Sequence, residues 1–495
     1  MNENEEIMAQ GHIMQKNFKF FGLLTGIYAC FFTFCLYRNI AGITVPFFTV
    51  GTLCYYYLCM KKLEVSRNRS GYFYEVAIIL LGCATWITDD ERVIVMNYGG
   101  MFILIVSFMM HQFFHDKEWD IPQYIATFCV TIIESILCLG QPFYDCNYMI
   151  KAREKGKDNK VKYVFMGLFI SIPFIIIILM LLSSADSVFA NTLDFLWKNI
   201  VIPKNLIVIM LMTAFAFLSS YSFFAFLIKE KVEWQKGKRK EGEPIIAITF
   251  TALIALIYIF FSGIQVIYLF MGNIPGGYSY AQYAREGFFQ LVAVCILNLA
   301  LVLFSIYYFK DHKVLKMILT VISLCTYIMI ASSAFRMVLY ISQYQLTFLR
   351  IFVLWSLVVI FLMMTGIIIF ILKPEFPLLK YTIITMTSLY IVFSFSHPDY
   401  LIAKYNYGQN NFSKENLVDS DYLYELCGDA APAIFDYTEQ LKKETGLSLT
   451  KASAIDFRSY FTKIYNNGKD MDARTFNLSK YFAKNAAAEF LDGNN

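Results

Sequence analysis

The chain of 495 residues is too apolar and too sparsely charged for a soluble globular protein. Hydrophobic residues make up 58% of it and charged residues 16%, whereas soluble chains are about half apolar and a quarter charged. The formal net charge is only +4, and the basic residues lie in short connecting segments, which indicates orientation in a membrane. We therefore expect the lipid bilayer as a partner and no nucleic acid.

Apolar segments that are long enough to cross a bilayer recur through most of the chain. A hydrocarbon core of about 30 Å needs about 20 residues at 1.5 Å each. The candidate spans are 18–36, 40–60, 72–88, 93–113, 121–139, 163–182, 206–228, 245–271, 287–309, 314–335, 351–372 and 378–395. The sequence predicts an all-α protein, a polytopic transmembrane helical bundle of about 11 to 12 spans.

Polar segments lie on either side of this region. Residues 1–17 are polar and lead into a first helix without a signal-peptide cleavage site. The tail, 397–495, is richer in charge, yet it keeps apolar residues such as Ile434 and Phe461. We expect three parts: a polar N-terminal segment (1–17), a transmembrane domain (18–396) and a small α-helical polar domain (397–495).

Basic loops predict the orientation of the spans. The lysine-rich runs at 151–162 and 229–240 should be cytoplasmic, which places the turn at 310–316 inside and the C-terminal domain outside. The basic run at 61–69 also favours the inside, but three candidate spans, an odd number, separate it from the run at 151–162. An odd number of spans cannot join two inside loops, so either one of the three lies along the surface or re-enters, or the basic run at 61–69 breaks the rule. We expect eleven crossings, with the N-terminus inside and the tail outside. Frequent Ile, Asn, Lys, Phe and Tyr suit an AT-rich bacterial genome, so we expect a bacterial cell membrane.

Motifs for catalysis, metals or nucleotides are not recognisable in the sequence. Most of the 11 cysteines lie in apolar segments, where they act as small packing residues. His111 and His115 have a spacing that suits a metal, with Asp116 and Glu118 nearby, but the spacing fixes no third ligand, and we interpret them as interfacial histidines. The acidic run from Asp89 to Arg92 is interpreted as a solvated hairpin tip. We expect no metal and no cofactor.

Charged residues inside apolar segments are the candidates for function, because a charge in hydrocarbon costs on the order of 2.5 to 3.5 kcal/mol. Glu286 and Arg336 lie about 27 and 23 residues from the intervening turn near Lys313, so their depths agree within about 6 Å. They would form an outward-facing polar cleft in which Arg336 or Arg285 holds an anion. The full candidate set is Glu286, Arg285, Arg336, Tyr340, Asn298 and Asp186. The alternative is a structural ion pair with interhelical hydrogen bonds.

Several motifs resemble one bacterial membrane family. They read YAREGFFQLVAV (283–294), SADSVF (184–189), SAFRMVLY (333–340), HPDYLIAKYN (397–406), DSDYL (419–423) and FNLS (476–479). The sequence is similar to the family catalogued as domain of unknown function 4173 and to its sibling 4153. It differs at Gln290, where the resemblance implies an acidic residue, and at His397, where it implies Asn. The resemblance supplies no activity, but on the predicted topology its shared positions lie on the outer side, beneath a capping tail.

Three functional hypotheses follow. The first is a transporter or lipid-handling protein with the outward-facing polar cleft. The second is a membrane-embedded signalling or regulatory protein that senses through its C-terminal domain and has a membrane or envelope protein as its partner. The third is an integral membrane transferase, for which Glu286 and Asp186 are the candidate carboxylates. Because no catalytic motif is visible, we favour a protein that is not an enzyme.

Overall fold

The structure is a computed structural model. It describes residues 13–153, 204–229, 242–267, 288–408, 422–445 and 457–493, except for residues 66, 115, 117, 118 and 423, together with scattered residues between 167 and 192. The chain forms two compact units, each of which is described by itself. Unit 1 is Met1–Arg38, Gly51–Ser66 and Cys129–Lys231, and unit 2 is Asn39–Val50, Arg67–Phe128 and Val232–Asn495.

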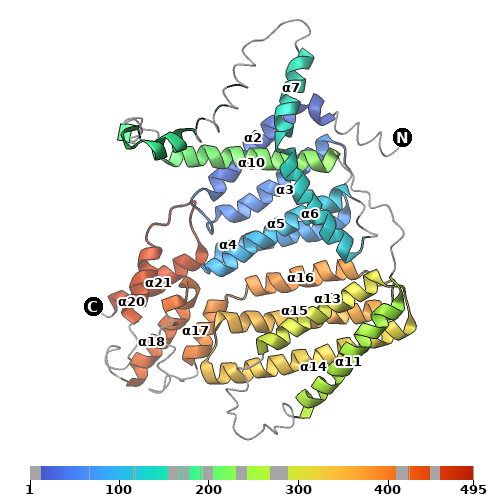
Figure 1. The fold of residues 1–495 in the computed structure, drawn as a ribbon. Helices are drawn as coiled ribbons and strands as arrows, with labels where there is room; N and C mark the ends of the chain where they lie inside the picture. Colours follow the sequence, from blue (N-terminus) through green and yellow to red (C-terminus); the bar gives the residue numbers. More distant parts are fainter. Residues whose placement is uncertain are drawn as a thin grey trace. The chain divides into compact units, whose positions relative to one another are not determined.

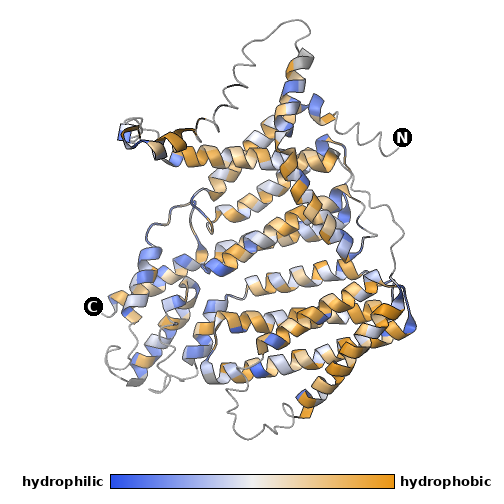
Figure 2. Ribbon diagram, in the orientation of Figure 1, coloured by the Kyte–Doolittle hydropathy of each residue, from blue (hydrophilic) through white to orange (hydrophobic). Residues whose placement is uncertain are grey.

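Long apolar helices dominate the described residues, which contain no named strand (Figures 1 and 2). Nine helices there have the length and composition of membrane spans, and a bent pair makes up to ten. In lipid each backbone amide must be paired within the segment, which an α-helix achieves. The predicted all-α polytopic fold is confirmed. The predicted span 40–60 forms helix α3 (Thr44–Lys62) but is absent from these nine, and 163–182 falls mostly outside the described residues.

Unit 1 is held together by aromatic and hydroxyl side chains. Its main helices are α2 (Phe18–Leu36), α7 (Gln141–Arg153) and α10 (Lys204–Lys229), with parts of α3 and of α6 (Ile121–Leu137). The Tyr221 hydroxyl of α10 donates to Asp145 of α7 over 2.7 Å. Tyr28 of α2 stacks on Tyr55 of α3 with ring centroids 4.4 Å apart. The hydrogen bond satisfies two polar groups between α10 and α7, and the stacked rings pack α2 against α3.

The membrane helices of unit 2 pack around one long helix. They are α4 (Tyr72–Ile87), α5 (Glu91–Phe113), α11 (Pro244–Gln265), α13 (Phe288–Tyr308), α14 (Lys313–Tyr344), α15 (Phe348–Leu372) and α16 (Leu378–Ser394). Helix α14 contacts α11, α13 and α15, and α16 contacts both α15 and α4. Asn97 of α5 accepts hydrogen bonds from Tyr390 and Ser394 of α16, each over 2.7 Å. The α15–α16 contact is close at Gly366, where a Cβ atom would lie 2.3 Å from the Tyr381 ring.

The C-terminal helices of unit 2 form their own core. They are α17 (Pro398–Gly408), α18 (Ala431–Thr445), α20 (Phe457–Asn467) and α21 (Leu478–Asp492), drawn in orange and red in Figure 1. In α20 the buried side chains recur at helical spacing, which gives the helix one apolar face; they are Phe457, Tyr460, Phe461 and Ile464. This core includes residues of α17. The predicted small helical domain is therefore present, within unit 2.

A sharp bend separates the last membrane helix from this domain. Helices α16 and α17 meet at 55°, and His397 at the break has a φ of 48°, a left-handed conformation in which Asn, Asp and His are enriched. With 17 residues, α16 meets the lower limit for a crossing. The two helices together have the composition of one span, with the bend of a broken span or a re-entrant loop. The expected three-part division of the chain stays a prediction.

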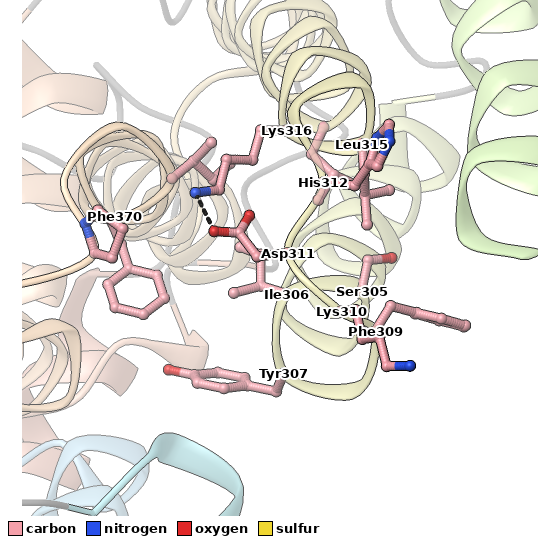
Figure 3. A pocket seen from close by; sticks show the side chains of 13 residues that line it. Ser305, Ile306, Tyr307, Phe309, Lys310, Asp311, His312, Leu315, Lys316 and Phe370 are labelled. Carbon is pink, nitrogen blue, oxygen red and sulfur yellow. Dashed lines mark hydrogen bonds and ion pairs between the residues drawn. The ribbon is translucent and has the colours of Figure 1, made fainter. Parts of the chain in front are cut away.

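The turn between α13 and α14 closes one end of the unit 2 helices. The Gly242 amide donates to the Tyr308 carbonyl over 2.9 Å, and the Lys310 amide donates back to the Gly242 carbonyl over 3.1 Å. These two bonds fix the chain just before α11 against the turn. A cavity of about 180 Å³ opens beside it, lined by charged and aromatic side chains (Figure 3).

Candidate functional site

The turn between α4 and α5 begins a network of buried charges. Asp90 is the N-cap of α5, and its carboxylate accepts the Arg92 amide over 2.9 Å. The same carboxylate accepts the Arg92 guanidinium at both oxygens, over 2.9 and 2.8 Å. Such bidentate pairs are strong and directional. Asp90 is only 1% exposed, so the interpretation of this turn as a solvated hairpin tip is wrong.

Arg92 also connects the turn to the C-terminal domain. Its Nη2 atom lies 2.6 Å from Oδ1 of Asp399, which is in the first turn of α17 and is fully buried. The other Asp399 oxygen accepts the Cys427 amide over 2.9 Å, and the guanidinium covers the Phe348 ring at 4.0 Å. One arginine therefore compensates two buried carboxylates that are more than 300 residues apart in sequence.

Asp429 is the centre of a second group of hydrogen bonds at the same α4–α5 turn. Its carboxylate accepts the Thr88 hydroxyl over 2.6 Å and the Asp89 amide over 2.7 Å. It also accepts the Ser479 hydroxyl of α21 and pairs with Nδ1 of His397 at 3.1 Å. The side chain is completely buried. A buried carboxylate with this many donors holds the elements that supply them in fixed positions.

The charge balance of the network is negative. Asp89, Asp90, Asp399 and Asp429 contribute −4, and Arg92 and Lys480, which pairs with Asp89 at 3.2 Å, contribute +2. The sum is −2 with a neutral His397 and −1 with a protonated one. This excess of negative charge favours the protonated forms of the titratable side chains in the network.

The pKa values follow from this balance. The hydrogen bond with Asp429 raises the pKa of His397 above its usual value, against the opposing effect of burial. Burial raises the pKa of Asp89, with the nearby Asp429 charge acting in the same direction. Burial alone would raise the pKa of Asp429, but the hydrogen bonds from His397, Ser479 and Thr88 lower it below its usual value. His397 is 30% exposed, so its proton exchanges with solvent at the edge of the network.

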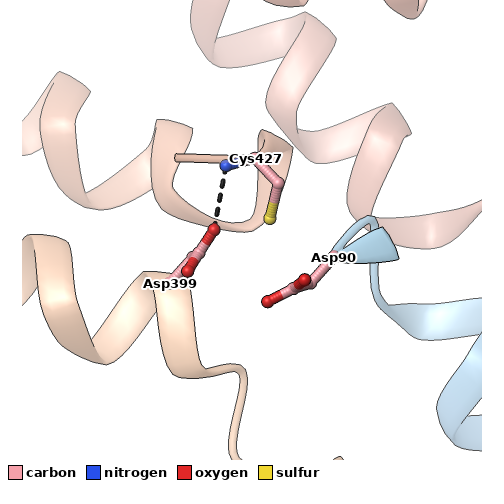
Figure 4. Close-up of side chains that lie close together, drawn as sticks. All are labelled: Asp90, Asp399 and Cys427. Atoms are coloured by element: carbon pink, nitrogen blue, oxygen red, sulfur yellow. Dashed lines mark hydrogen bonds between the residues drawn. The ribbon is translucent and has the colours of Figure 1, made fainter. Parts of the chain in front are cut away.

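Asp90, Asp399 and Cys427 form a group with the geometry of a metal site, because one ligand atom of each lies within 4.8 Å of the others (Figure 4). Their chemistry does not fit a metal. Arg92 contacts both carboxylates and supplies the positive charge that a cation would bring. Burial holds the pKa of the Cys427 thiol well above its usual value.

Arg336 of α14 is the charged residue of the predicted polar cleft that lies in unit 2 within the described part of the chain. It is 6% exposed, and its Nη2 donates to Oε1 of Gln265 on α11 over 3.2 Å. Ser332, one turn earlier, donates to the same oxygen over 2.6 Å. Arg285 and Glu286 lie outside the described residues. The pairing of Arg336 with Glu286 therefore stays a prediction.

The other predicted cleft residues have separate surroundings. The Tyr340 ring lies under the Arg350 guanidinium at 4.3 Å. Asn298 of α13 donates to Thr326 of α14 over 2.9 Å, about 15 Å along α14 from Arg336 at 1.5 Å per residue. The structure thus groups Arg336 with Gln265 and Ser332, and places Asn298 several turns away.

Asp186 belongs to the other compact unit. It is exposed, and it accepts the amides of Val188 and Phe189 over 2.7 and 3.4 Å. A carboxylate in this position caps a helix N-terminus. Its place in a shared cleft with the unit 2 residues stays a prediction.

Two positions from the family-like motifs hold α17 in place. Asp399 joins the Arg92 network. The Asn406 side chain accepts the Leu346 amide over 2.8 Å and donates to the Leu346 carbonyl over 2.9 Å, which fixes α17 to the α14–α15 connection.

The two histidines with metal-like spacing have different outcomes. His111 pairs with Asp116 at 2.6 Å and with Ser70, while His115 lies outside the described residues.

The apolar helices and the polar C-terminal domain define a multi-pass membrane protein. The sequence profile of the family described as "Domain of unknown function (DUF4153)" matches residues 76–437, and the chain belongs to this family. No curated protein matches the chain, and no solved structure matches it.

The resemblance noted in the sequence is confirmed for domain of unknown function 4153, and the likeness to 4173 stays a prediction. The matched range includes Asp90, Arg92, Asp399 and Asp429, and it ends before Ser479. Most of the charge network therefore lies within the family's own domain.

Proposed function

We propose that this protein is a membrane-embedded regulatory protein, whose C-terminal domain senses a condition at the membrane surface and passes it to the transmembrane helices. The observation that carries the proposal is the junction itself. Arg92, at the start of a membrane helix, is shared between Asp90 beside it and Asp399 of α17. The membrane or envelope protein that receives the signal would bind this assembly.

The chemistry of the junction suits a switch. Regulatory switches are commonly local changes of charge that bias an element with two arrangements. Here the domain is joined to the α4–α5 turn by buried ionic and hydrogen-bonding groups, and breaking one partner of a buried ion pair is strongly destabilising. A single change of charge at Arg92, Asp399 or Asp429 would therefore alter the position of the domain.

His397 supports the same proposal from a second direction. It lies at the α16–α17 bend, is partly exposed, and pairs with Asp429. Protonation of His397 adds one positive charge to a network whose net charge is negative. A group at this place couples the pH of the adjacent solvent to the contact between the domain and the helices.

The test measures domain position and biological effect in the same variants. Spin labels at Lys469 in the C-terminal domain and at Glu375 in the α15–α16 turn, both exposed, report the distance between the domain and the far end of the helices. We expect Arg92→Gln to broaden this distance distribution. We also expect it to fail to complement a strain that lacks the gene. Arg92→Gln with Asp90→Asn and Asp399→Asn, which removes the charges of both ion pairs of Arg92, should restore both the distance distribution and the biological effect.

Lys443→Gln is the control, because Lys443 is exposed on α18 of the same domain, and exposed charges contribute little. Membrane levels and monodispersity in detergent must match the wild type for every variant. An Arg92→Gln protein with a released domain and full biological effect would show that the junction transmits nothing.

A specific observation favours transport or lipid handling as the second candidate function. Gln265, Ser332 and Arg336 form a buried polar group between α11 and α14, beside an otherwise apolar core. Ionisable residues within membrane helices commonly mark substrate pathways. Gln265→Leu should then reduce substrate-dependent activity while the level of protein in the membrane is maintained, and unchanged activity would exclude this role for the group.

A further inference from the structure

The cavity at the α13–α14 turn combines a cationic opening with an apolar wall. Lys310, His312 and Lys316 line it together with Asp311, and Leu319, Phe370 and Ile371 form part of its apolar lining (Figure 3). Its volume of about 180 Å³ accommodates a small polar headgroup rather than a whole lipid. A site of this composition suits a molecule that is anionic at one end and apolar at the other.

The lysines are held by partners that an anion can replace. Lys316 lies 2.7 Å from Asp311, and Lys310 lies 3.0 Å from Glu243. Both carboxylates are more than two-thirds exposed. Exposed pairs of this kind are worth about 0 to 1 kcal/mol, so a phosphate that contacts both lysines competes with two weak single contacts.

His312 adds a hydrogen-bond donor to the same opening. Its Nδ1 atom accepts the Val314 amide over 3.2 Å as the N-cap of α14. In the neutral ring the other nitrogen, Nε2, then carries the proton. The lysine ammonium groups and this N–H are the donors that phosphate oxygens accept.

The position of the cavity along the helices matches the headgroup layer. Helix α13 ends at Tyr308, α14 begins at Lys313 and α15 ends at Leu372, so the cavity lies where three apolar helices reach their polar ends. Met317 and Leu372, each next in sequence to a lining residue, are exposed apolar side chains. Basic pockets between membrane helices bind the headgroups of anionic lipids.

We propose that this cavity binds the phosphate-bearing headgroup of an anionic phospholipid, with Lys310 and Lys316 contacting the phosphate and with the acyl chains beside the exposed apolar residues. The bound lipid would replace Asp311 and Glu243 as the partners of the two lysines. The site is in unit 2 at the α13–α14 turn, and it uses none of the residues of the Arg92 network.

The experiment uses the purified full-length protein in detergent and native mass spectrometry, with phosphatidylglycerol as the anionic lipid and phosphatidylcholine as the zwitterionic one. We expect Lys310→Gln with Lys316→Gln to weaken phosphatidylglycerol binding about 30-fold, at about fivefold for each lysine, and to leave phosphatidylcholine binding unchanged. The matched control is Lys61→Gln with Lys62→Gln, which removes the same charge from the end of another apolar helix, α3. Equal losses in the two double variants, or no loss in the first, would overturn the proposal.

A gain of binding separates the site from a general loss of folding. Asp311→Asn removes the carboxylate that competes for Lys316 and should strengthen phosphatidylglycerol binding by a few fold; unchanged or weaker binding would contradict the assignment. Inorganic phosphate at millimolar concentration distinguishes the two sources of the anion. Retention of the lipid supports a phospholipid site, whereas complete displacement would mean that the cavity recognises free phosphate and would overturn the lipid assignment.

Discussion

Removal of the Arg92 charge should open the contact between the C-terminal domain and the α4–α5 turn. Arg92→Gln leaves Asp399 fully buried, with the Cys427 amide as a described partner, and leaves Asp90 1% exposed. Breaking a buried ion pair in this way costs about 3 to 5 kcal/mol. The Arg92 side chain is itself 39% exposed, so water reaches the vacated position, and we expect a cost of about 3 kcal/mol.

Cys427 is the natural reporter of this opening. It lies between Asp399 and Asp429 in the junction, and burial raises its pKa well above the usual value, so it reacts only when the contact opens. Labelling of the purified protein with a maleimide, followed by mass spectrometry of the peptide that contains Cys427, measures the opening equilibrium. A cost of about 3 kcal/mol corresponds to labelling that is about 150-fold faster.

Two further variants show whether the uncompensated charge is the cause. Arg92→Gln with Asp90→Asn and Asp399→Asn should recover most of the protection, because neutral amides of similar shape replace both carboxylates that Arg92 compensates. Lys443→Gln, at an exposed position of the same domain, should change the labelling by less than about fivefold. Labelling of Arg92→Gln at the wild-type rate would refute the conclusion that Arg92 holds the domain.

Two other predictions concern the bend and the helix packing. The pKa of His397 is raised in the folded protein, so its protonation stabilises the junction fully below the pKa of the unfolded chain, and this stabilisation is lost as pH rises through the folded pKa. Cys427 labelling should therefore increase about fivefold between pH 6 and 8. The labelling rates are corrected for thiol ionisation with a free peptide. His397→Asn keeps a side chain suited to the φ of 48° and should remove this increase; an unchanged pH dependence would assign it to another group. Gly366→Val places atoms against the Tyr381 ring and should destabilise the protein by about 1 to 3 kcal/mol in thermal unfolding in detergent. Gly263→Ala, in open space on α11, should be neutral or stabilising. Equal effects of the two variants would contradict the packing at Gly366.

The left-handed backbone at His397 also explains one departure from the resembled family. The family-like motif implies Asn at this position, and Asn tolerates a positive φ because its short polar side chain bonds locally. Histidine keeps that conformation and adds a titratable ring beside Asp429. We therefore expect His397→Asn to keep the bend and to remove a titratable group from the junction.

The sequence alone determined the class of fold. Runs of about 20 apolar residues can satisfy their backbone in lipid only as helices, so composition and segment length sufficed to predict a polytopic all-α bundle. The apolar spacing in the tail likewise indicated a helical domain with its own core. The sequence also indicated Arg336 as a costly charge within an apolar helix. The structure places Arg336 in a buried polar group with Gln265.

Only the tertiary structure revealed the Arg92 network. Asp90 and Arg92 are separated from Asp399 and Asp429 by more than 300 residues, and no local pattern links residues so far apart. In sequence, two aspartates and an arginine between apolar helices look like a solvated turn, because nothing nearby indicates what covers them. The fold brings α17, η6 (Gly428–Ala430) and α21 onto that turn, and burial then converts ordinary surface charges into a junction whose stability depends on each partner.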